Sequence, residues 1–120
     1  MYLAAPDYHL LVEDGRITLS VDERVQFSRP SVDVLLATAA ESYRERCVGV
    51  VLTGANADGA EGLARVAELG GVAIVQDPST AARGEMPRAA LAAVPDARVA
   101  ELEEIAPILV ELCGTQKAAA

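Results

Sequence analysis

Apolar residues along the chain follow two patterns, one typical of buried β-strands and one typical of amphipathic helices. Cys47–Leu52 is an unbroken apolar run bounded by polar residues, and Val72–Val75 is a second run of the same kind. Strands of parallel sheets have this continuous apolar character because helices cover both of their faces. Both segments are therefore predicted to be parallel strands in the interior of a sheet.

Around these two runs, apolar residues recur at spacings of three and four, which marks one face of a helix. Helices are predicted from Pro30 to Tyr43, from Gly59 to Leu69, over Arg88–Ala93 after the opening pair Met86-Pro87, and from Leu102 to Cys113. A strand, a helix and a second strand in this order form a βαβ unit, whose crossover is expected to be right-handed.

The start of the chain predicts β-structure of another kind. His9–Glu13 and Arg16–Ser20 flank Asp14-Gly15, a two-residue turn signal that is typical of antiparallel hairpins. Tyr2–Pro6 is predicted to be a short strand that ends at proline. The predicted fold class is α/β: part of a doubly wound, Rossmann-like, mostly parallel sheet flanked by helices, with a small N-terminal antiparallel hairpin. With two convincing parallel strands after the hairpin, the sheet looks incomplete.

Composition and charge exclude several classes of function. The net charge is −8, with 18 acidic and 10 basic residues, which disfavours binding to nucleic acid and to anionic lipid. No apolar run approaches the ~20 residues that span a bilayer, and no signal peptide opens the chain. One histidine and two separated cysteines offer nothing for a zinc site. A cytoplasmic chain without metal or cofactor is expected.

The loop Thr53–Gly59, after the first parallel strand, holds the candidate chemistry. In open α/β sheets, functional groups collect in loops at the carboxyl ends of the strands. Gly54 and Gly59 bracket this loop, and Asp58 lies at the start of the next helix. A carboxylate there either caps the free N–H groups of a helix or serves as a functional group, and the local sequence leaves both open.

Four ordered stretches of the chain resemble the CheB-type protein-glutamate methylesterases of bacterial chemotaxis. Gly49–Leu63 resembles the signature around their catalytic aspartate. The other stretches, which resemble the family's hairpin entry, the start of its helix, and its last strand and following turn, are Leu3–Leu10, Ser28–Asp33, and Gly70–Pro78 with Met86-Pro87. The resemblance spans Met1 to about Ile105.

This resemblance implies a Ser-His-Asp triad that hydrolyses glutamate methyl esters on chemoreceptors and deamidates certain glutamines, with no cofactor and no metal. It places the catalytic aspartate at Asp58 and the oxyanion or active-site loop at Gly54, Ala55, Asn56 and Gly59. Ala55 stands where a methionine is common in the family. If its backbone N–H holds the oxyanion, the change of side chain should matter little.

The chain lacks the other two triad residues that the resemblance implies. No serine lies in a Gly-x-Ser-x-Gly context, and the family's serine and histidine are both expected upstream. His9, the single histidine, matches a different family motif and is expected near the cleft. Residues 1–114 are therefore interpreted as the C-terminal portion of a CheB-type domain, inactive alone, and 115–120 as a disordered tail.

The expected partner is a methylated chemoreceptor, bound as a protein substrate. Self-association is also expected, because an incomplete sheet exposes a strand edge that recruits other strands. An alternative interpretation is a non-catalytic interaction module, or a remnant of the fold. A third is a small-ligand binder at the Gly54–Gly59 loop, although no Gly-x-Gly-x-x-Gly or Walker pattern favours it.

Overall fold

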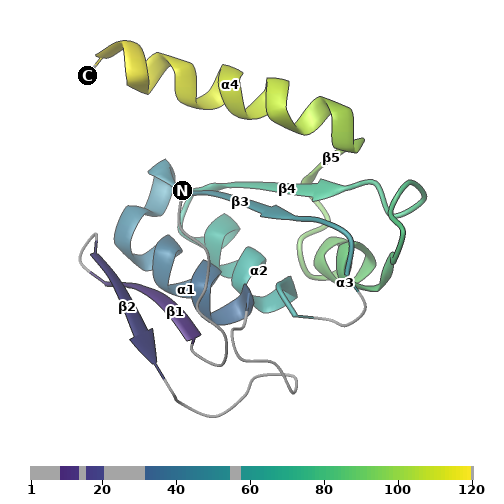
Figure 1. The fold of residues 1–120 in the computed structure, drawn as a ribbon, viewed down its shortest axis with the longest axis horizontal. Helices are drawn as coiled ribbons and strands as arrows, with labels where there is room; N and C mark the ends of the chain where they lie inside the picture. Colours follow the sequence, from purple (N-terminus) through teal and green to yellow (C-terminus); the bar gives the residue numbers. More distant parts are fainter. Residues whose placement is uncertain (1–8, 14–15, 21–31, 55–57, 120) are drawn as a thin grey trace.

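A parallel sheet with the strand order β3-β4-β5 lies at the centre of the molecule (Figure 1). The structure is a computed structural model that describes residues 9–13, 16–20, 32–54 and 58–119. The strands are β3 (Val48–Val51), β4 (Val72–Gln76) and β5 (Arg98–Ala100). The two predicted parallel strands are thus confirmed. β5 is not predicted from the sequence, because it has only 3 residues and its first two are exposed.

The predicted helices are present with small shifts at their ends. They are α1 (Val32–Tyr43), followed by the 3-10 turn η1 (Arg44–Arg46), α2 (Ala60–Glu68), α3 (Glu85–Ala93) and α4 (Leu102–Ala119). α4 is longer than the sequence predicts, and it gives helix over most of the segment for which a disordered tail is expected. Gln116, Lys117, Ala118 and Ala119 are all good helix formers, which favours this continuation. None of the helices in the described residues is both long and apolar enough to cross a membrane.

Helices cover both faces of the sheet, as in a doubly wound fold. α1, α2 and α3 lie on one side of β3 and β4, and α4 lies on the other (Figure 1). The buried core between the sheet and α1–α3 consists of Leu36, Ala40, Cys47, Val51, Leu63, Val66, Ala73, Val75, Ala90 and Val94. The smaller core under α4 consists of Ile74, Ala100, Ile105 and Ile108. β4 faces both cores, which explains its continuous apolar sequence.

A two-stranded antiparallel sheet lies beside α1, away from the parallel sheet (Figure 1). Its strands are β1 (His9–Glu13) and β2 (Arg16–Ser20). The backbone N–H of Val12 donates to Thr38 Oγ1 at 2.9 Å, and Ser42 Oγ donates to the Val12 carbonyl at 3.3 Å. The predicted turn Asp14-Gly15 and the predicted strand Tyr2–Pro6 lie outside the described residues.

Candidate functional site

The carboxylate of Asp58 lies at the junction of the β3–α2 loop and the first turn of α1. Its side chain is buried, with 4% of the residue exposed. Oδ2 accepts a hydrogen bond from the Val32 N–H at 2.7 Å, and Oδ1 accepts one from the Asp33 N–H at 2.9 Å. Asp58 therefore caps a helix, but that helix is α1, whose first two N–H groups lie 26 and 25 positions before it in the sequence. It is not the helix that follows it in the sequence.

The N-terminus of α2 is capped in turn by a carboxylate of α1. Asp33, in the first turn of α1, is 7% exposed. Its Oδ1 accepts hydrogen bonds from the Gly59 N–H at 2.9 Å and from the Gly62 N–H at 2.8 Å. Asp33, a residue of α1, therefore caps α2, and Asp58, which lies just before α2, caps α1. We call Asp33, Asp58 and these four backbone N–H groups the aspartate clasp.

Two glycines at the N-terminal end of α2 make the clasp possible. Gly59 is the N-cap residue of α2 and Gly62 follows three positions later. These are the positions at which the side chains of a capping box would normally satisfy the same N–H groups. Neither glycine has a side chain to do so, and one oxygen of Asp33 serves both. Gly59 also has φ of 105°, a conformation that favours glycine.

Gly62 is needed for a second reason, the closeness of α1. A Cβ at this position would lie 2.7 Å from Leu36 Cβ and 2.9 Å from the carbonyl oxygen of Asp33. Real Cβ atoms do not approach backbone so closely without a shift of the helix. The absence of a side chain at Gly62 therefore lets α1 come near enough for the Asp33 carboxylate to reach the α2 N-terminus.

The electrostatics of the clasp combine attraction and repulsion. Helix N-termini carry partial positive charge, so a carboxylate at each is favourable. Burial raises the pKa of the Asp33 carboxyl above its ordinary value. The Gly62 N–H acts in the opposite direction, and the negative charge of Asp58 raises this pKa further. Asp33 Oδ2 is buried and accepts no hydrogen bond from the described residues, which adds to the cost of ionising this group.

The exit of β3 is tied to the segment that precedes α3. The Gly54 N–H donates to the Arg83 carbonyl at 2.9 Å, and the Met86 N–H donates to the Gly54 carbonyl at 3.1 Å. Thr53 Oγ1 donates to the same Arg83 carbonyl at 3.0 Å and accepts from the Arg83 N–H at 2.7 Å. A Cβ at Gly54 would collide with the Met86 side chain, so this close contact requires glycine.

A buried amide from the neighbouring strand supports the same exit. Gln76, the last residue of β4, is 4% exposed. Its Oε1 accepts a hydrogen bond from the Thr53 N–H at 3.1 Å. The carboxyl ends of β3 and β4 are therefore linked by a side chain as well as by backbone. This places the first residues of the loop in a fixed relation to the sheet.

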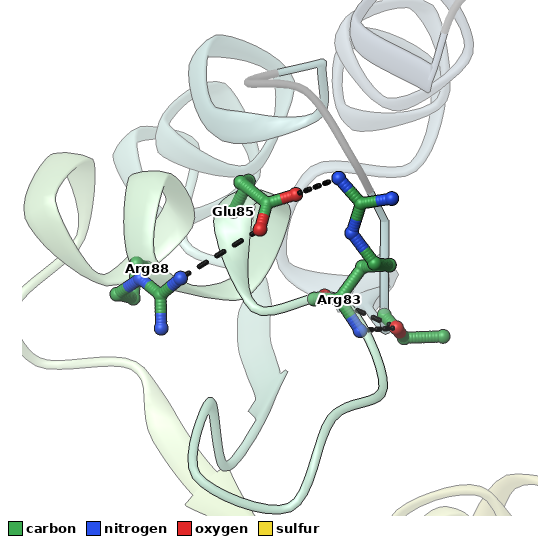
Figure 2. A network of polar contacts seen from close by, with 4 residues as sticks. Arg83, Glu85 and Arg88 are labelled. Carbon is green, nitrogen blue, oxygen red and sulfur yellow. Dashed lines mark hydrogen bonds and ion pairs between the residues drawn. The ribbon is translucent and has the colours of Figure 1, made fainter.

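Charged side chains lie on the outer side of this loop pair. Glu85 stands between two guanidinium groups, with Arg83 Nη2 at 3.1 Å and Arg88 Nη2 at 3.7 Å (Figure 2). The arginine side chains are 64% and 63% exposed. Exposed pairs of this kind contribute little to stability. Their position beside the β3 exit gives a surface of mixed charge next to the candidate site.

The residues that the sequence singles out have different outcomes. Asp58, Gly54 and Gly59 lie together at the ends of β3, α1 and α2, but the N–H groups of Gly54 and Gly59 already donate to Arg83 and Asp33. Ala55 and Asn56 lie outside the described residues. His9 is the first residue of β1, and its side chain also lies outside the described part. Within that part, no group of three His, Cys, Asp or Glu side chains could hold a metal ion.

Sequence reasoning assigned no role to Asp33 or Gln76. Asp33 lies within the Ser28–Asp33 stretch that resembles the family's helix start, but an aspartate in the first turn of a helix is explained by the helix dipole alone. Its contacts are with residues 26 and 29 positions away. For Gln76, the available sequence signal is a polar residue at the end of an apolar strand.

The chain is similar to known methylesterases over most of its length. A family model described as CheB methylesterase matches residues 1–109. A relative from Leptospira interrogans is 51% identical over 113 residues, which are 93% of this chain and 58% of the relative. The protein-glutamate methylesterase FrzG of Myxococcus xanthus is 44% identical over 92 residues, which are 76% of this chain and 28% of that protein.

A solved structure agrees with the fold. The crystal structure of the Thermotoga maritima CheB methylesterase catalytic domain superposes with a TM-score of 0.81 at 31% sequence identity. The match covers 88% of this chain and 58% of that structure. The chain therefore spans a little over half the length of the catalytic domain and of the Leptospira relative that it matches.

Proposed function

The chain belongs to the CheB methylesterase family, and we propose that it contributes the aspartate and the oxyanion loop of a chemotaxis methylesterase site. The reaction is hydrolysis of glutamate methyl esters on a methylated chemoreceptor, with deamidation of glutamines at the same site. Asp58 is the aspartate of a Ser-His-Asp triad. The 120 residues contain neither a serine nor a histidine in the sequence context that the family's triad residues have.

The observation that carries the proposal is the fixed position of Asp58. Its carboxylate is buried at the carboxyl end of β3, where functional groups of α/β sheets collect. Its two backbone bonds to α1 hold the carboxylate in one orientation. A carboxylate accepts up to about four hydrogen bonds, so these contacts are compatible with a further bond from an imidazole N–H.

In this site, each group has a defined part in the chemistry. The serine hydroxyl attacks the ester carbonyl, and the histidine takes its proton and later returns it to the leaving methanol. Asp58 holds the histidine in the tautomer that faces the serine, and it stabilises the imidazolium that forms during attack. A second attack, by water, releases the glutamate.

The oxyanion of the intermediate needs backbone donors that are not otherwise engaged. The N–H groups of Gly54 and Gly59 donate to protein acceptors, so they position the loop. Ala55 and Asn56 complete the proposed oxyanion loop and lie outside the described residues, so the resemblance to the family alone supports an oxyanion role for them. A donor of this kind typically contributes a factor of about 10²–10³ to turnover.

The alternative is a non-catalytic interaction module that keeps the fold of the family. The absence of a Gly-x-Ser-x-Gly serine and of a second histidine favours this alternative for the 120 residues alone. The two proposals differ in what happens when the rest of a methylesterase domain is supplied. Only the first expects activity to appear.

The test uses a chimera, in which the part of the Leptospira interrogans relative that this chain does not match precedes this chain. Methanol release from a methylated receptor fragment is measured for the chain alone, for the chimera, and for the chimera with Asp58→Asn. We expect no turnover from the chain alone, turnover from the chimera, and a loss of about 10³–10⁴-fold in kcat with Asp58→Asn. A folded but inactive chimera would favour the interaction module.

A matched control separates catalysis from helix capping. Glu104 Oε1 accepts a hydrogen bond from the Glu101 N–H at 2.9 Å, at the start of α4 on the opposite face of the sheet. Loss of this one hydrogen bond through Glu104→Ala costs about 0.5–1.5 kcal/mol of stability and should leave kcat within about 2-fold. If Asp58→Asn behaves like this control, Asp58 is a cap and the proposal is wrong.

A further inference from the structure

Asp33 has a buried carboxyl group, and two short hydrogen bonds join it to the backbone that follows Asp58. Both bonds use one oxygen, at 2.9 Å from the Gly59 nitrogen and 2.8 Å from the Gly62 nitrogen. Gly59 is the residue immediately after Asp58. Any movement of the α2 N-terminus relative to α1 therefore moves the backbone that carries the Asp58 side chain.

The connection also runs in the other direction. Asp58 holds the N–H groups of Val32 and Asp33, which are the first two residues of α1 in the described chain. Asp58 thus fixes the backbone that carries the Asp33 side chain. Asp33 in turn fixes the backbone that follows Asp58. The contacts form a closed cycle, in which each carboxylate accepts hydrogen bonds from the backbone next to the other.

Helix stability alone would not require this arrangement. A capping box, with serine or threonine at position 59 and glutamate or glutamine at position 62, would satisfy the same N–H groups locally, which is a common solution. The chain has glycine at positions 59 and 62 instead, and it uses a buried carboxylate from another helix. A buried carboxylate next to a second one is a costly way to cap a helix. A function that needs Asp58 in one fixed place explains the cost.

We propose that Asp33 is the positioning residue for Asp58: it holds the α2 N-terminus so that the Asp58 carboxylate keeps the orientation required to accept the N–H of a catalytic histidine. This inference rests on the proposed function of Asp58. Asp33 touches neither substrate nor histidine in this role. It acts through the backbone of Gly59 and Gly62.

Two substitutions at Asp33 separate its charge from its hydrogen bonds. In Asp33→Asn, the amide oxygen takes the place of Oδ1 and accepts both N–H groups, while the amide nitrogen takes the place of Oδ2, which has no hydrogen-bond partner among the described residues. In Asp33→Ala, both hydrogen bonds are lost. The asparagine variant should therefore keep Asp58 in position, and the alanine variant should release it.

The first measurement tests the clasp in the 120-residue chain itself, without reference to activity. Amide hydrogen exchange is followed by NMR for Gly59, Gly62, Val32 and Asp33. Asp33→Ala should remove protection at Gly59 and Gly62 directly, and at Val32 through the released Asp58. Asp33→Asn should preserve it at all of these sites except the substituted residue. Protection at Val32 that survives Asp33→Ala would show that the two carboxylates are not coupled, and the inference would fail.

The second measurement tests positioning in the chimera. Active sites are counted with a serine-reactive phosphonate, so that misfolded protein does not enter kcat. We expect Asp33→Ala to lower kcat per site by about 10–100-fold, the effect of a small misplacement of a reacting group, with KM changed by less than about 2-fold. Asp33→Asn should stay within about 3-fold of the parent in kcat.

The pH profile gives a readout that a purely structural role would not move. A nearby carboxylate raises the pKa of a histidine, because it favours the charged imidazolium. When Asp58 is displaced, the acidic limb of the kcat/KM profile should shift to lower pH in Asp33→Ala and remain in place in Asp33→Asn. The control Glu104→Ala should lower the melting temperature without moving the limb.

The outcomes distinguish this inference from the proposed function. If Asp58→Asn abolishes turnover but Asp33→Ala leaves both kcat per site and the pH profile unchanged, Asp33 has only a structural role and the inference is wrong. If Asp58→Asn itself remains active, the proposed function is wrong and the inference falls with it. Rescue of kcat and of the pH limb by asparagine, with loss of both in alanine, supports the inference.

Discussion

Asp33 caps α2 with one carboxylate oxygen, whereas Asp58 caps α1 with two. This difference controls which substitutions each position tolerates. Asp33 uses a single oxygen for the N–H groups of Gly59 and Gly62. Asp58 uses one oxygen for each of the two N–H groups of α1. An asparagine can reproduce the first arrangement. At position 58, its NH₂ group would face a backbone donor, so Asp58→Asn is not a neutral replacement for a cap and needs the stability control described above.

The same geometry predicts how stability depends on pH at residue 33. Burial raises the pKa of the Asp33 carboxyl above its ordinary value of 3.8. Between that value and the folded-state pKa, the folded chain binds more protons than the unfolded chain, so the free energy of unfolding falls as pH rises through this window. The cost of the buried charge is fully present above the folded-state pKa and absent below 3.8.

Asp33→Asn removes this ionisation while it keeps both hydrogen bonds. We therefore expect the variant to gain stability relative to the parent as pH rises from about 3.5 to 7, a difference that urea unfolding at several pH values measures directly. The comparison of two chains cancels the titration of all other carboxylates. A stability difference that does not change with pH, or that changes in the opposite direction, would contradict a raised pKa at Asp33.

At the scale of elements, the closest contact in the site is between α1 and α2 at Gly62. In Gly62→Ala, the new Cβ would lie 2.7 Å from Leu36 Cβ and 3.0 Å from Asp33 Cα. The helices must separate, which weakens the bond between Asp33 Oδ1 and the Gly62 N–H. Overpacking of this kind typically costs about 1–3 kcal/mol. It outweighs the gain of about 1 kcal/mol in helix propensity, so we expect net destabilisation in thermal or urea unfolding.

A control in the same helix measures the propensity contribution alone. Ala67 is exposed in α2, and Ala67→Gly should cost about 0.5–1 kcal/mol, because no packing changes. If Gly62→Ala stabilises the chain by the amount that Ala67→Gly destabilises it, α1 is not as close to α2 as the contacts indicate.

The whole molecule presents a sheet edge at β3. Among the described strands, β3 pairs with β4 on one side and has no strand on the other. Leu52, which follows β3, is 39% exposed. Unpaired strand edges recruit strands from other chains, so self-association through this edge remains a prediction for the isolated chain.

Light scattering after size exclusion tests this prediction. We expect a dimer or a larger species that grows with concentration, because association by mass action depends on protomer concentration. The chimera should be monomeric, since the added segment is expected to cover the β3 edge. A monodisperse monomer of the isolated chain at high concentration would show that the edge is closed by other means.

The sequence by itself determined the main elements. Continuous apolar runs predict β3 and β4, and spacings of three and four predict α1 to α4, because strand burial and helix periodicity act over a few neighbouring residues. The Gly49–Leu63 stretch pointed to the family and to Asp58. The local pattern of the three β5 residues is too weak to predict a strand. β5 forms because β4 pairs with it, in the register Ile74↔Arg98, Val75↔Val99 and Gln76↔Ala100.

Only the tertiary structure decided how the site is held. Asp58 could be recognised from the sequence as a cap or a functional carboxylate, but the helix that it caps depends on where α1 lies relative to α2. The bonds of the aspartate clasp join residues 25 to 29 positions apart, and their formation depends on the close crossing that Gly62 permits. Local patterns contain no information on such a crossing, because it arises from the packing of both helices against the same sheet.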